Sequence, residues 1–376
     1  MNIAILTLPI NVNYGGILQG YALQTILERQ GHKVLFLNLR YKPQHIIIRS
    51  LVFCKHFIYS LIFNKKYISQ KDWLYVSREL TRFRLQYMKL SKSLYTNEEL
   101  YKEYKKNKFD VIIYGSDQIW SSYYAPQLDC YFGSFLGHSD KVKQVAYAAS
   151  FGTSNGFDYG MRKMKVYSEL LKKFTKVSVR ENSGVDICQK CFGLEAKLVL
   201  DPTLLLDANE YRKLVNKACT FPSAGNLHVY ILDESEEKSS IVSQVAKENS
   251  LIPFFSNKNV LDMSVPIEQK TLYSLEQWIR SFDDASFVVT DSFHGCIFSI
   301  LFKKTFIAIA NKQRGLERFL SLLSLFNLND RLIFSYDEFK MRKSELLHPI
   351  NYNIVFNKLE QLRKESFLYL NDALYL

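Results

Sequence analysis

One stretch, residues 288–297, constrains the fold more than any other part of the sequence. It opens with the buried-strand pattern Val288-Val289-Thr290, continues through polar residues and a glycine, and ends in an apolar run, residues 296–302, with helical potential. This predicts a strand–turn–helix junction with His294 at the tip of the turn. In parallel α/β sheets, ligands bind outside the carboxyl ends of strands, beside helix N-termini.

Two interpretations of this junction are open. An imidazole at such a position can bind an anion or move a proton. Alternatively, Ser292 is merely a helix N-cap and His294 lies in a surface turn. The motif alone does not decide between them, because a motif needs its structural context.

Length and charge bound the class of protein. A chain of 376 residues exceeds one ordinary core, so we expect two domains. Its composition, 47% hydrophobic and 23% charged, is globular. The net charge of +12 favours acidic partners, namely phosphorylated substrates, nucleic acid or an anionic membrane surface. No zinc-finger spacing, RNP-like motif or arginine-rich arm supports nucleic acid, which we therefore do not expect.

The N-terminus and the cysteines indicate a cytoplasmic protein. Residues 1–9 lack a charged leader and a long apolar run, so they predict a first strand, not a signal peptide. Six scattered cysteines suit a reducing compartment. Cys188 and Cys191 form one CxxC pair, but no second pair completes a zinc set. We expect no metal site and place this pair on a helix.

The N-terminal part predicts a βαβ unit over residues 1–39, with Gly15 and Gly16 at its first turn. This is neither GxGxxG nor a P-loop. The glycines either let backbone N–H groups approach a ligand or simply make a tight turn. Residues 46–63 are the most apolar stretch, but interspersed charges make them a poor transmembrane span. With basic flanks, the region 46–78 either lies on an anionic membrane surface or is a buried helical insertion, which we favour slightly.

Polar residues follow several predicted strands. Asp117 comes after strand 109–114, and Arg180 follows strand 177–179. A further strand is predicted at residues 198–203, where Pro202 stops it. Asp117 is a candidate acid or base, or else a cap. Arg180 is a candidate bidentate ligand for carboxylate or phosphate, or else a partner of a surface salt bridge. Because strand ends of a parallel sheet share one edge, these side chains predict a site there.

The βα alternation restarts after residue 226, with a strand predicted at 228–232 and a helix at 236–248, and predicts a second Rossmann-like unit. Arg314 and Arg318 lie at the start of its helix 315–325, and residues 353–371 predict an amphipathic C-terminal helix. The predicted fold is thus α/β, with two Rossmann-like lobes. We assign residues 1–204 to the N-terminal lobe, with an insertion at about 41–90, residues 205–348 to the C-terminal lobe, and residues 349–376 to the C-terminal helix.

Eight segments together resemble the polysaccharide pyruvyl transferase family. They cover nearly the whole chain in the family's order, apart from the 46–90 region. The matching segments are 13–19, 21–24, 115–120, 148–152, 177–181, 200–205, 290–295 and 314–319.

The resemblance implies a two-lobed fold similar to the B-type glycosyltransferases, with the site in the cleft between lobes. It further implies phosphoenolpyruvate as donor and a sugar of a capsular, exopolysaccharide or cell-wall glycan as acceptor. The pyruvate would be installed on two hydroxyls as a cyclic ketal. One departure matters: some members carry an arginine where this chain has Ser292.

Carried over residue by residue, the resemblance suggests a division of roles. His294 would bind the phosphate and protonate the leaving group, and Asp117 would do acid–base work. The N-terminal lobe would hold the acceptor and the C-terminal lobe most of the donor. A lipid-linked acceptor would bring the basic 46–78 region to the inner face of the membrane. No metal or cofactor is expected beyond phosphoenolpyruvate as co-substrate. The predicted donor residues are Arg180, Ser292, Gly295, Arg314 and Arg318, and the predicted acceptor residues are Asn13, Tyr14, Gly15, Gly16 and Gln19.

Two rival functions remain open. A nucleotide-sugar-dependent glycosyltransferase of the same fold would also place basic residues and a histidine in the cleft. A non-catalytic member of a glycan assembly complex would tolerate replacement of Arg180 and His294. The first rival is distinguished from a pyruvyl transferase by whether phosphoenolpyruvate or a nucleotide sugar raises the melting temperature. Several strand ends carry residues that handle anions and protons, which favours an enzyme over the second.

Overall fold

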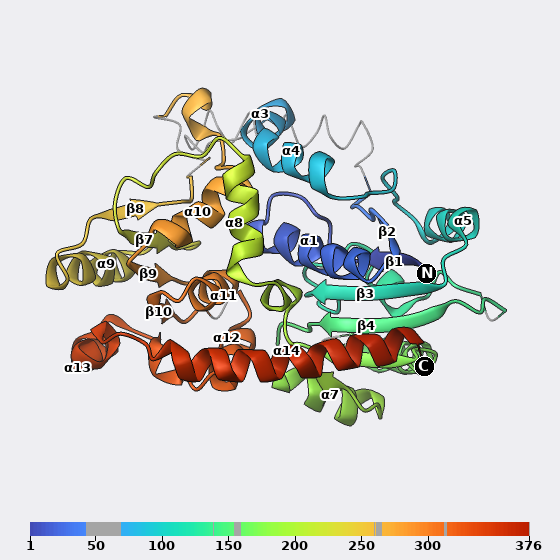
Figure 1. Cartoon of the computed structure of the whole chain (residues 1–376). Helices are drawn as coiled ribbons and strands as arrows, with labels where there is room; N and C mark the ends of the chain where they lie inside the picture. The colour runs from blue at the N-terminus through green and yellow to red at the C-terminus, as the bar shows by residue number, and fades with distance from the viewer. Residues whose placement is uncertain are drawn as a thin grey trace, which may run out of the picture.

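The computed structural model describes residues 1–42, 69–137, 139–153, 159–258, 260, 265–311 and 314–375. Two parallel sheets lie side by side, each with helices packed against it (Figure 1). We call them the N-terminal and C-terminal lobes. The apolar stretch 46–63, and with it most of the basic region 46–78, lies outside the described residues.

The N-terminal lobe is built on a six-stranded sheet in the order β2-β1-β3-β4-β5-β6. Its strands are the short apolar runs of the sequence. Ile112, Ile113 and Tyr114 of the central strand are completely buried, as expected for a parallel sheet covered on both faces. The strands are β1 Asn2–Leu6, β2 Lys33–Phe36, β3 Val111–Asp117, β4 Lys143–Ala149, β5 Lys176–Val179 and β6 Lys197–Leu198.

The C-terminal lobe carries a five-stranded sheet in the order β11-β10-β9-β7-β8. Val288 and Val289 of its central strand are fully buried. The order and parallel pairing confirm the predicted α/β class. The strands are β7 Leu227–Tyr230, β8 Pro253–Phe255, β9 Phe287–Thr290, β10 Thr305–Ile309 and β11 Leu332–Ile333.

Helices of the two lobes follow the predicted alternation. Most begin at a Ser, Thr, Asp or Asn whose side chain accepts a backbone N–H, the usual N-cap device. The N-terminal lobe has α1 Tyr14–Arg29, α3 Gln70–Val76, α4 Arg78–Tyr87, α5 Asn97–Asn107, α6 Gly160–Leu171 and α7 Asn182–Phe192. The linker helix is α8 Ala208–Lys217. The C-terminal lobe has α9 Glu236–Glu248, α10 Leu275–Asp284, α11 Phe293–Leu301, α12 Leu316–Leu325 and α13 Tyr336–Leu347. The last helix of the chain is α14 Tyr352–Tyr375.

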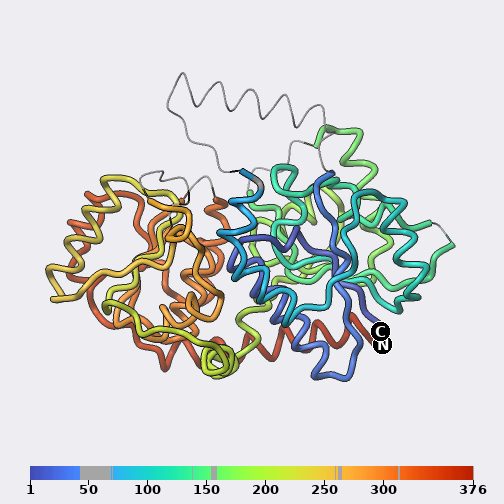
Figure 2. Tube along the Cα trace, turned by 90° about the horizontal axis from the view of Figure 1, so that it is seen from above, coloured from blue at the N-terminus to red at the C-terminus, as the bar shows by residue number. Residues whose placement is uncertain are grey.

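The C-terminal helix α14 spans both lobes (Figure 1). At its start, the Tyr352 hydroxyl donates to the carbonyl of Ser299 in α11 at 3.1 Å. Further along, the Arg363 guanidinium donates to the carbonyls of Leu204 and Leu206 at 2.6 and 2.8 Å. Viewed from above, both chain ends lie at the far end of the N-terminal lobe (Figure 2). Helix α14 therefore ties the C-terminal lobe back to the N-terminal one.

Helices α3 and α4 make a second connection between the lobes. Arg82 of α4 donates to both carboxylate oxygens of the buried Glu276 in α10 at 2.9 Å. The Leu272 N–H donates to the Val76 carbonyl at 2.8 Å. This part of the predicted insertion therefore packs against the opposite lobe. Within the described ranges, no helix has the length and apolar character needed to cross a bilayer.

Two local predictions were wrong, and two elements were not predicted. The predicted strand at residues 198–203 ends after Leu198, because Asp201 caps the 3₁₀ turn η2 Pro202–Leu205. Helix α11 begins at Phe293, so His294 lies in its first turn and not at the tip of a loop. Ser292 is the N-cap, as the alternative interpretation predicted. Strand β11 and helix α13 were not predicted.

Candidate active site

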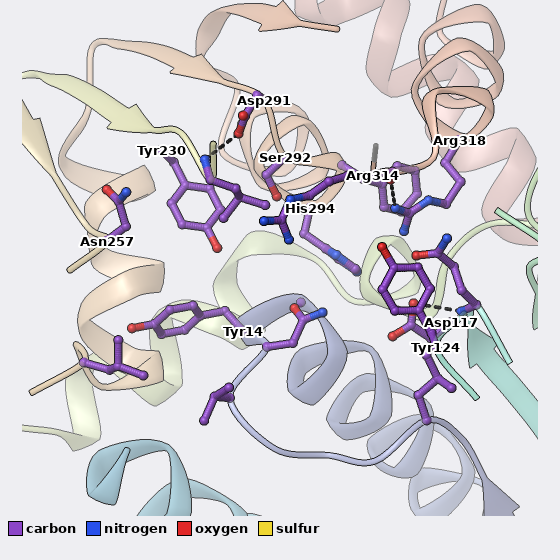
Figure 3. Close-up of a pocket in the computed structure, with 18 of the residues that line it drawn as sticks. Tyr14, Asp117, Tyr124, Tyr230, Asn257, Asp291, Ser292, His294, Arg314 and Arg318 are labelled. Carbon is purple, nitrogen blue, oxygen red and sulfur yellow. Dashed lines mark hydrogen bonds between the residues drawn. The ribbon is translucent and has the colours of Figure 1, made fainter. Parts of the chain in front are cut away.

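A cavity of about 480 Å³ lies between the lobes, at the carboxyl edges of both sheets (Figure 3). In each sheet the strand order reverses once, between β1 and β3 and between β7 and β9. Loops diverge at such a switch point and leave a crevice. Leu8 and Asp117 line the cavity from the first crevice, and Tyr230 and Ser292 line it from the second. Two binding crevices thus face one another.

Two helix N-termini also meet at this cavity. Asn13 caps α1, where its side-chain oxygen accepts the Gly16 N–H at 3.1 Å. Ser292 caps α11, where its hydroxyl accepts the Gly295 N–H at 3.3 Å. Both capping residues line the cavity. The positive ends of two helix dipoles therefore favour an anion here.

The two helices approach closely because Gly15 has no side chain. A Cβ on Gly15 would lie 2.0 Å from Nδ1 of His294. The imidazole therefore packs directly on the backbone of α1. His294 is 6% exposed and lines the cavity together with Gly15. Gly15 thus sets the position of the histidine across the lobe boundary.

A buried charge cluster lies behind His294. Arg180 donates to Oδ1 of Asp117 at 2.9 Å and to Oδ2 of Asp201 at 2.7 Å. All three side chains are almost completely buried. Nε2 of His294 lies 3.8 Å from Oδ2 of Asp201, too far for a hydrogen bond. Strands β3 and β5 and the η2 turn of one lobe thus support the histidine of the other.

The cluster sets the protonation states of the site. Burial raises the pKa of Asp117, but Arg180, Arg318, His294 and the Gln118 N–H together outweigh burial and hold this pKa below its usual value. The pKa of Asp201 is lowered likewise, because His294, Arg180 and the two hydrogen bonds from Thr203 together outweigh burial. Burial lowers the pKa of His294 to about 4. The carboxylates are therefore ionised near neutral pH, and the imidazole is neutral.

Arg318 is the exceptional cation of the cavity. It is 7% exposed and donates to the Arg314 carbonyl, and its guanidinium lies 5.2 Å from the centre of the Phe293 ring. Burial lowers its pKa to about 10, so it stays charged at neutral pH. Among the residues that the structure describes, no carboxylate oxygen lies within 4 Å of it, and its Nε has no hydrogen-bond partner. Asp117 and Glu181 offset part of its charge at longer range. A desolvated guanidinium without a direct ion pair is suited to an incoming anion.

Arg314, by contrast, is already paired. Its guanidinium donates to both oxygens of Asp233 at 2.7 and 2.8 Å, and the pair is partly exposed. Asp233 is held in turn by Asn311, whose amide donates at 2.6 Å. Asn311 also donates to the buried Asp291 at 3.1 Å. Arg314 can contact a ligand in the cavity only in competition with, or in addition to, Asp233.

The structure brings eight of the twelve predicted site residues to the cavity. The other four do not line the cavity and have contacts elsewhere. Arg180 is enclosed by its two carboxylates, and Gln19 donates to Thr7 and to the Gly16 carbonyl. The Gly16 and Gly295 N–H groups are used by the helix caps, so Gly295 is not a free donor. The eight cavity residues are Asn13, Tyr14, Gly15, Asp117, Ser292, His294, Arg314 and Arg318.

Two of the predicted residues, Tyr14 and Asp117, have further structural features. The Tyr14 ring stacks on Trp278 of the opposite lobe at 5.4 Å, and its hydroxyl donates to the Tyr273 carbonyl at 2.9 Å. Asp117 has a φ of +86°, an uncommon backbone conformation for a residue other than glycine. Such outliers often mark functional positions.

Sequence reasoning missed several residues of the cavity. Tyr230 ends strand β7, but the sequence predicted that this strand runs on to residue 232, so the strand-end argument did not identify Tyr230. Asn257 and Lys258 follow β8 in a loop that carries no recognisable motif. No group of three or more His, Cys, Asp or Glu side chains able to hold a metal exists within the described part of the chain. The absence of a metal remains a prediction.

Comparison with known proteins places this geometry in a family. Solved structures of UDP-N-acetylglucosamine 2-epimerases are similar in fold. The Rickettsia bellii enzyme has a TM-score of 0.53 at 9% identity, over 100% of this chain and 97% of its own. A putative Listeria monocytogenes enzyme of this name has a TM-score of 0.53 at 8% identity, over 96% and 90%. These similarities confirm the predicted fold, which the B-type glycosyltransferases share.

Sequence comparison adds the family. No curated protein sequence matches significantly. The family profile described as polysaccharide pyruvyl transferase matches residues 13–313, which include every segment of the predicted resemblance except the last. The chain therefore belongs to the polysaccharide pyruvyl transferase family, a family of transferases.

Proposed function

We propose that this protein transfers pyruvate from phosphoenolpyruvate to two hydroxyls of a glycan sugar, as a cyclic ketal. Family membership supports the reaction class. The observation that carries the choice of donor is Arg318, a buried cation without a carboxylate partner among the described residues, at the wall of the cavity. The phosphate and carboxylate of phosphoenolpyruvate would supply the negative charge that Arg318 lacks as a partner.

The donor would lie between the two helix N-termini. Its anionic groups need several positive partners, because an unpaired charge is costly to desolvate. Arg318 supplies one full charge, and the first turns of α1 and α11 supply backbone N–H groups. Arg314 supplies a second charge if it reorients from Asp233. Arg180 instead orients Asp117 and Asp201, in place of the donor-binding role that the resemblance suggested.

The protonation state of His294 indicates that it acts first as a base and only then as an acid. Near neutral pH, His294 is neutral, and so it takes up a proton before it can deliver one. His294 takes the proton of the first hydroxyl and passes it to the methylene carbon C3, which becomes the methyl group. The π electrons of the C2=C3 bond form the new C–H bond and leave C2 cationic, and the oxygen of the first hydroxyl bonds to C2.

Loss of phosphate completes the ketal. The C2–O bond to phosphate breaks, and the oxygen of the second hydroxyl bonds to C2. The proton of the second hydroxyl passes to the departing phosphate. Asp117, ionised and facing the cavity, is the residue proposed to relay it. The two hydroxyl protons thus end on the methyl group and on phosphate, and no electrons are left over.

The acceptor would occupy the remaining, more apolar part of the cavity. Tyr14 and Trp73 line it from the N-terminal lobe, and Tyr230 and Leu272 line it from the C-terminal lobe. Aromatic and aliphatic side chains suit the apolar faces of a sugar ring. A capsular, exopolysaccharide or cell-wall glycan, free or lipid-linked, is the proposed acceptor. A cytoplasmic enzyme working at the inner face of the membrane would meet a lipid-linked one.

Ligand-dependent thermal unfolding tests the donor. We expect phosphoenolpyruvate to raise the melting temperature of the wild type, because a ligand that binds only the folded state stabilises it. UDP-sugars should not do so at the same concentration. The opposite pattern would favour the nucleotide-sugar glycosyltransferase. Release of inorganic phosphate from phosphoenolpyruvate, dependent on added oligosaccharide, would establish turnover.

A further inference from the structure

The two ring nitrogens of His294 face different surroundings. Nδ1 lies against the backbone of Gly15, and both residues line the cavity. Nε2 is sealed from solvent, has no hydrogen-bond partner, and lies 3.8 Å from Oδ2 of Asp201. A neutral imidazole carries its proton on only one of these nitrogens. The surroundings of the ring therefore decide which nitrogen can react.

Asp201 is held too firmly to turn away. Its Oδ1 accepts the N–H of Thr203 at 3.0 Å and the Thr203 hydroxyl at 2.6 Å. Its Oδ2 accepts Arg180 Nη1 at 2.7 Å. Asp201 is 3% exposed and does not line the cavity. One oxygen is therefore fixed beside Nε2, from the lobe opposite to the histidine.

From this geometry we infer that Asp201 is a positioning residue that keeps the proton of His294 on Nε2. Nδ1 is then the nitrogen that accepts the proton of the acceptor hydroxyl. This inference rests on the proposed function for the hydroxyl, but the assignment of the tautomer does not. A carboxylate next to one ring nitrogen favours an N–H at that nitrogen. Contraction of the gap by about 1 Å would form an ordinary hydrogen bond.

The same pair then supports the charged ring. When Nδ1 accepts the hydroxyl proton, the imidazolium presents Nε2–H to a fixed carboxylate. Asp201 and Asp117 stabilise that charge, whereas Arg180 and Arg318 oppose it. Phe293 packs edge-on to the ring at 5.2 Å and carries no charge. Asp201 therefore makes His294 a stronger base than the burial of the ring alone would allow.

The test is nitrogen NMR of the full-length protein labelled with ¹⁵N-histidine, and it needs no substrate. The His294→Gln variant assigns the signal. Near neutral pH we expect His294 in the Nε2–H form in the wild type. Asp201→Asn should lose that preference, because an amide has no net charge to hold the proton. An Nδ1–H form in the wild type, or an unchanged tautomer in Asp201→Asn, would overturn the inference.

Thr203→Val is the matched control. It removes the 2.6 Å hydroxyl contact to the same carboxylate but leaves its charge and the Arg180 pair in place. It should destabilise the fold without changing the tautomer. A tautomer change of equal size in this variant would show that general loosening, and not the Asp201 charge, is responsible.

Kinetics then separate this inference from the proposed function. In Asp201→Asn we expect kcat to fall roughly 10–100-fold, because the base remains and only the group that orients it is lost. KM for phosphoenolpyruvate should stay within about threefold, because Asp201 lies outside the cavity, a pattern of loss confined to the transition state. A wild type with the Nε2–H tautomer but no turnover of phosphoenolpyruvate would refute the proposed reaction and leave the assignment standing.

Discussion

Arg180 and Arg318 both lie close to the ring of Phe293, yet only Arg318 lines the cavity. Their guanidinium groups lie 4.9 and 5.2 Å from the centre of the Phe293 ring, and both are buried. Arg180 has two carboxylate partners, whereas Arg318 has none within 4 Å in the described part of the chain. The comparison teaches that a buried arginine is a candidate anion site when the fold gives it no direct carboxylate partner.

The largest effect is expected from removal of Arg180, the arginine that has carboxylate partners. Arg180→Met leaves Asp117 and Asp201 buried without their cation. Removal of one partner of a buried ion pair costs about 3–5 kcal/mol. We expect a loss of this size in the free energy of unfolding, measured by urea denaturation. A stable variant that has merely lost donor affinity would contradict the structural role of Arg180.

Arg318→Met removes the arginine that has no direct carboxylate partner. A charged hydrogen bond contributes about 1.5–3 kcal/mol, so affinity for phosphoenolpyruvate should fall roughly 10–150-fold. Stability should hardly change, since no carboxylate loses its partner. Arg318→Lys, which keeps the charge but not the planar fork, should recover part of the affinity. Equal losses of stability in Arg318→Met and Arg180→Met would remove the distinction.

Gly15→Ala tests whether the cavity depends on contact between the lobes. Its Cβ would lie 2.0 Å from His294 Nδ1, whereas a Cβ on Gly16 would lie 3.4 Å from the nearest atoms, those of Asn13. Overpacking of this kind costs about 1–3 kcal/mol and should displace His294. We expect Gly15→Ala to lose most of its turnover and Gly16→Ala to keep it. The two glycines are adjacent, so a similar loss in both variants would point to the helix and not to the histidine.

The buried histidines predict how stability depends on pH. Burial lowers the pKa of His294 to about 4 and that of His228 to about 3, from 6.5. The unfolded chain therefore binds more protons below pH 6.5, so stability is present above that pH and is lost as pH falls towards these values. Each group contributes at most about 1.4 kcal/mol per pH unit. His294→Gln should flatten the decline in urea denaturation below pH 6.5; an unchanged slope would mean that the ring is not held neutral.

The smallest effect is expected at Arg314. Its pair with Asp233 is partly exposed, and such pairs contribute about 0–1 kcal/mol to stability. Arg314→Ala should raise KM for phosphoenolpyruvate several-fold without a measurable change in thermal unfolding. Asp233→Asn is the complementary variant, because it frees Arg314 and should leave KM equal or lower. A higher KM in Asp233→Asn would show that the pair itself, and not free Arg314, serves the donor.

Much of the fold follows from periodicity and turn residues. Short apolar runs predicted the long strands, and helix α9 coincides with the predicted helix, because local propensity and burial agree there. Strand β6 was overestimated, since Asp201 uses its side chain to cap a turn, which an apolar pattern does not reveal. Helix α11 begins earlier than predicted, because Ser292 caps it ahead of the glycine.

The candidate site was predicted only in part. The strand-end argument identified Asp117, Ser292 and His294, all of which line the cavity. It could not tell Arg180 from Arg318, because the neutralising contacts of Arg180 come from residues 63 and 21 positions away in sequence. Whether a buried arginine has a carboxylate partner depends on tertiary packing. The residue type and the local sequence pattern therefore do not predict it.

The central claim is that the cavity between the lobes binds phosphoenolpyruvate through Arg318. The most direct measurement is a calorimetric titration of the purified wild type and the Arg318→Met variant with phosphoenolpyruvate, and of the wild type with UDP-sugars. We predict saturable binding at one site in the wild type, weakened roughly 10–150-fold in the variant, and no binding of UDP-sugars. Equal affinity in both proteins, or saturable binding of a UDP-sugar with none of phosphoenolpyruvate, would contradict the account.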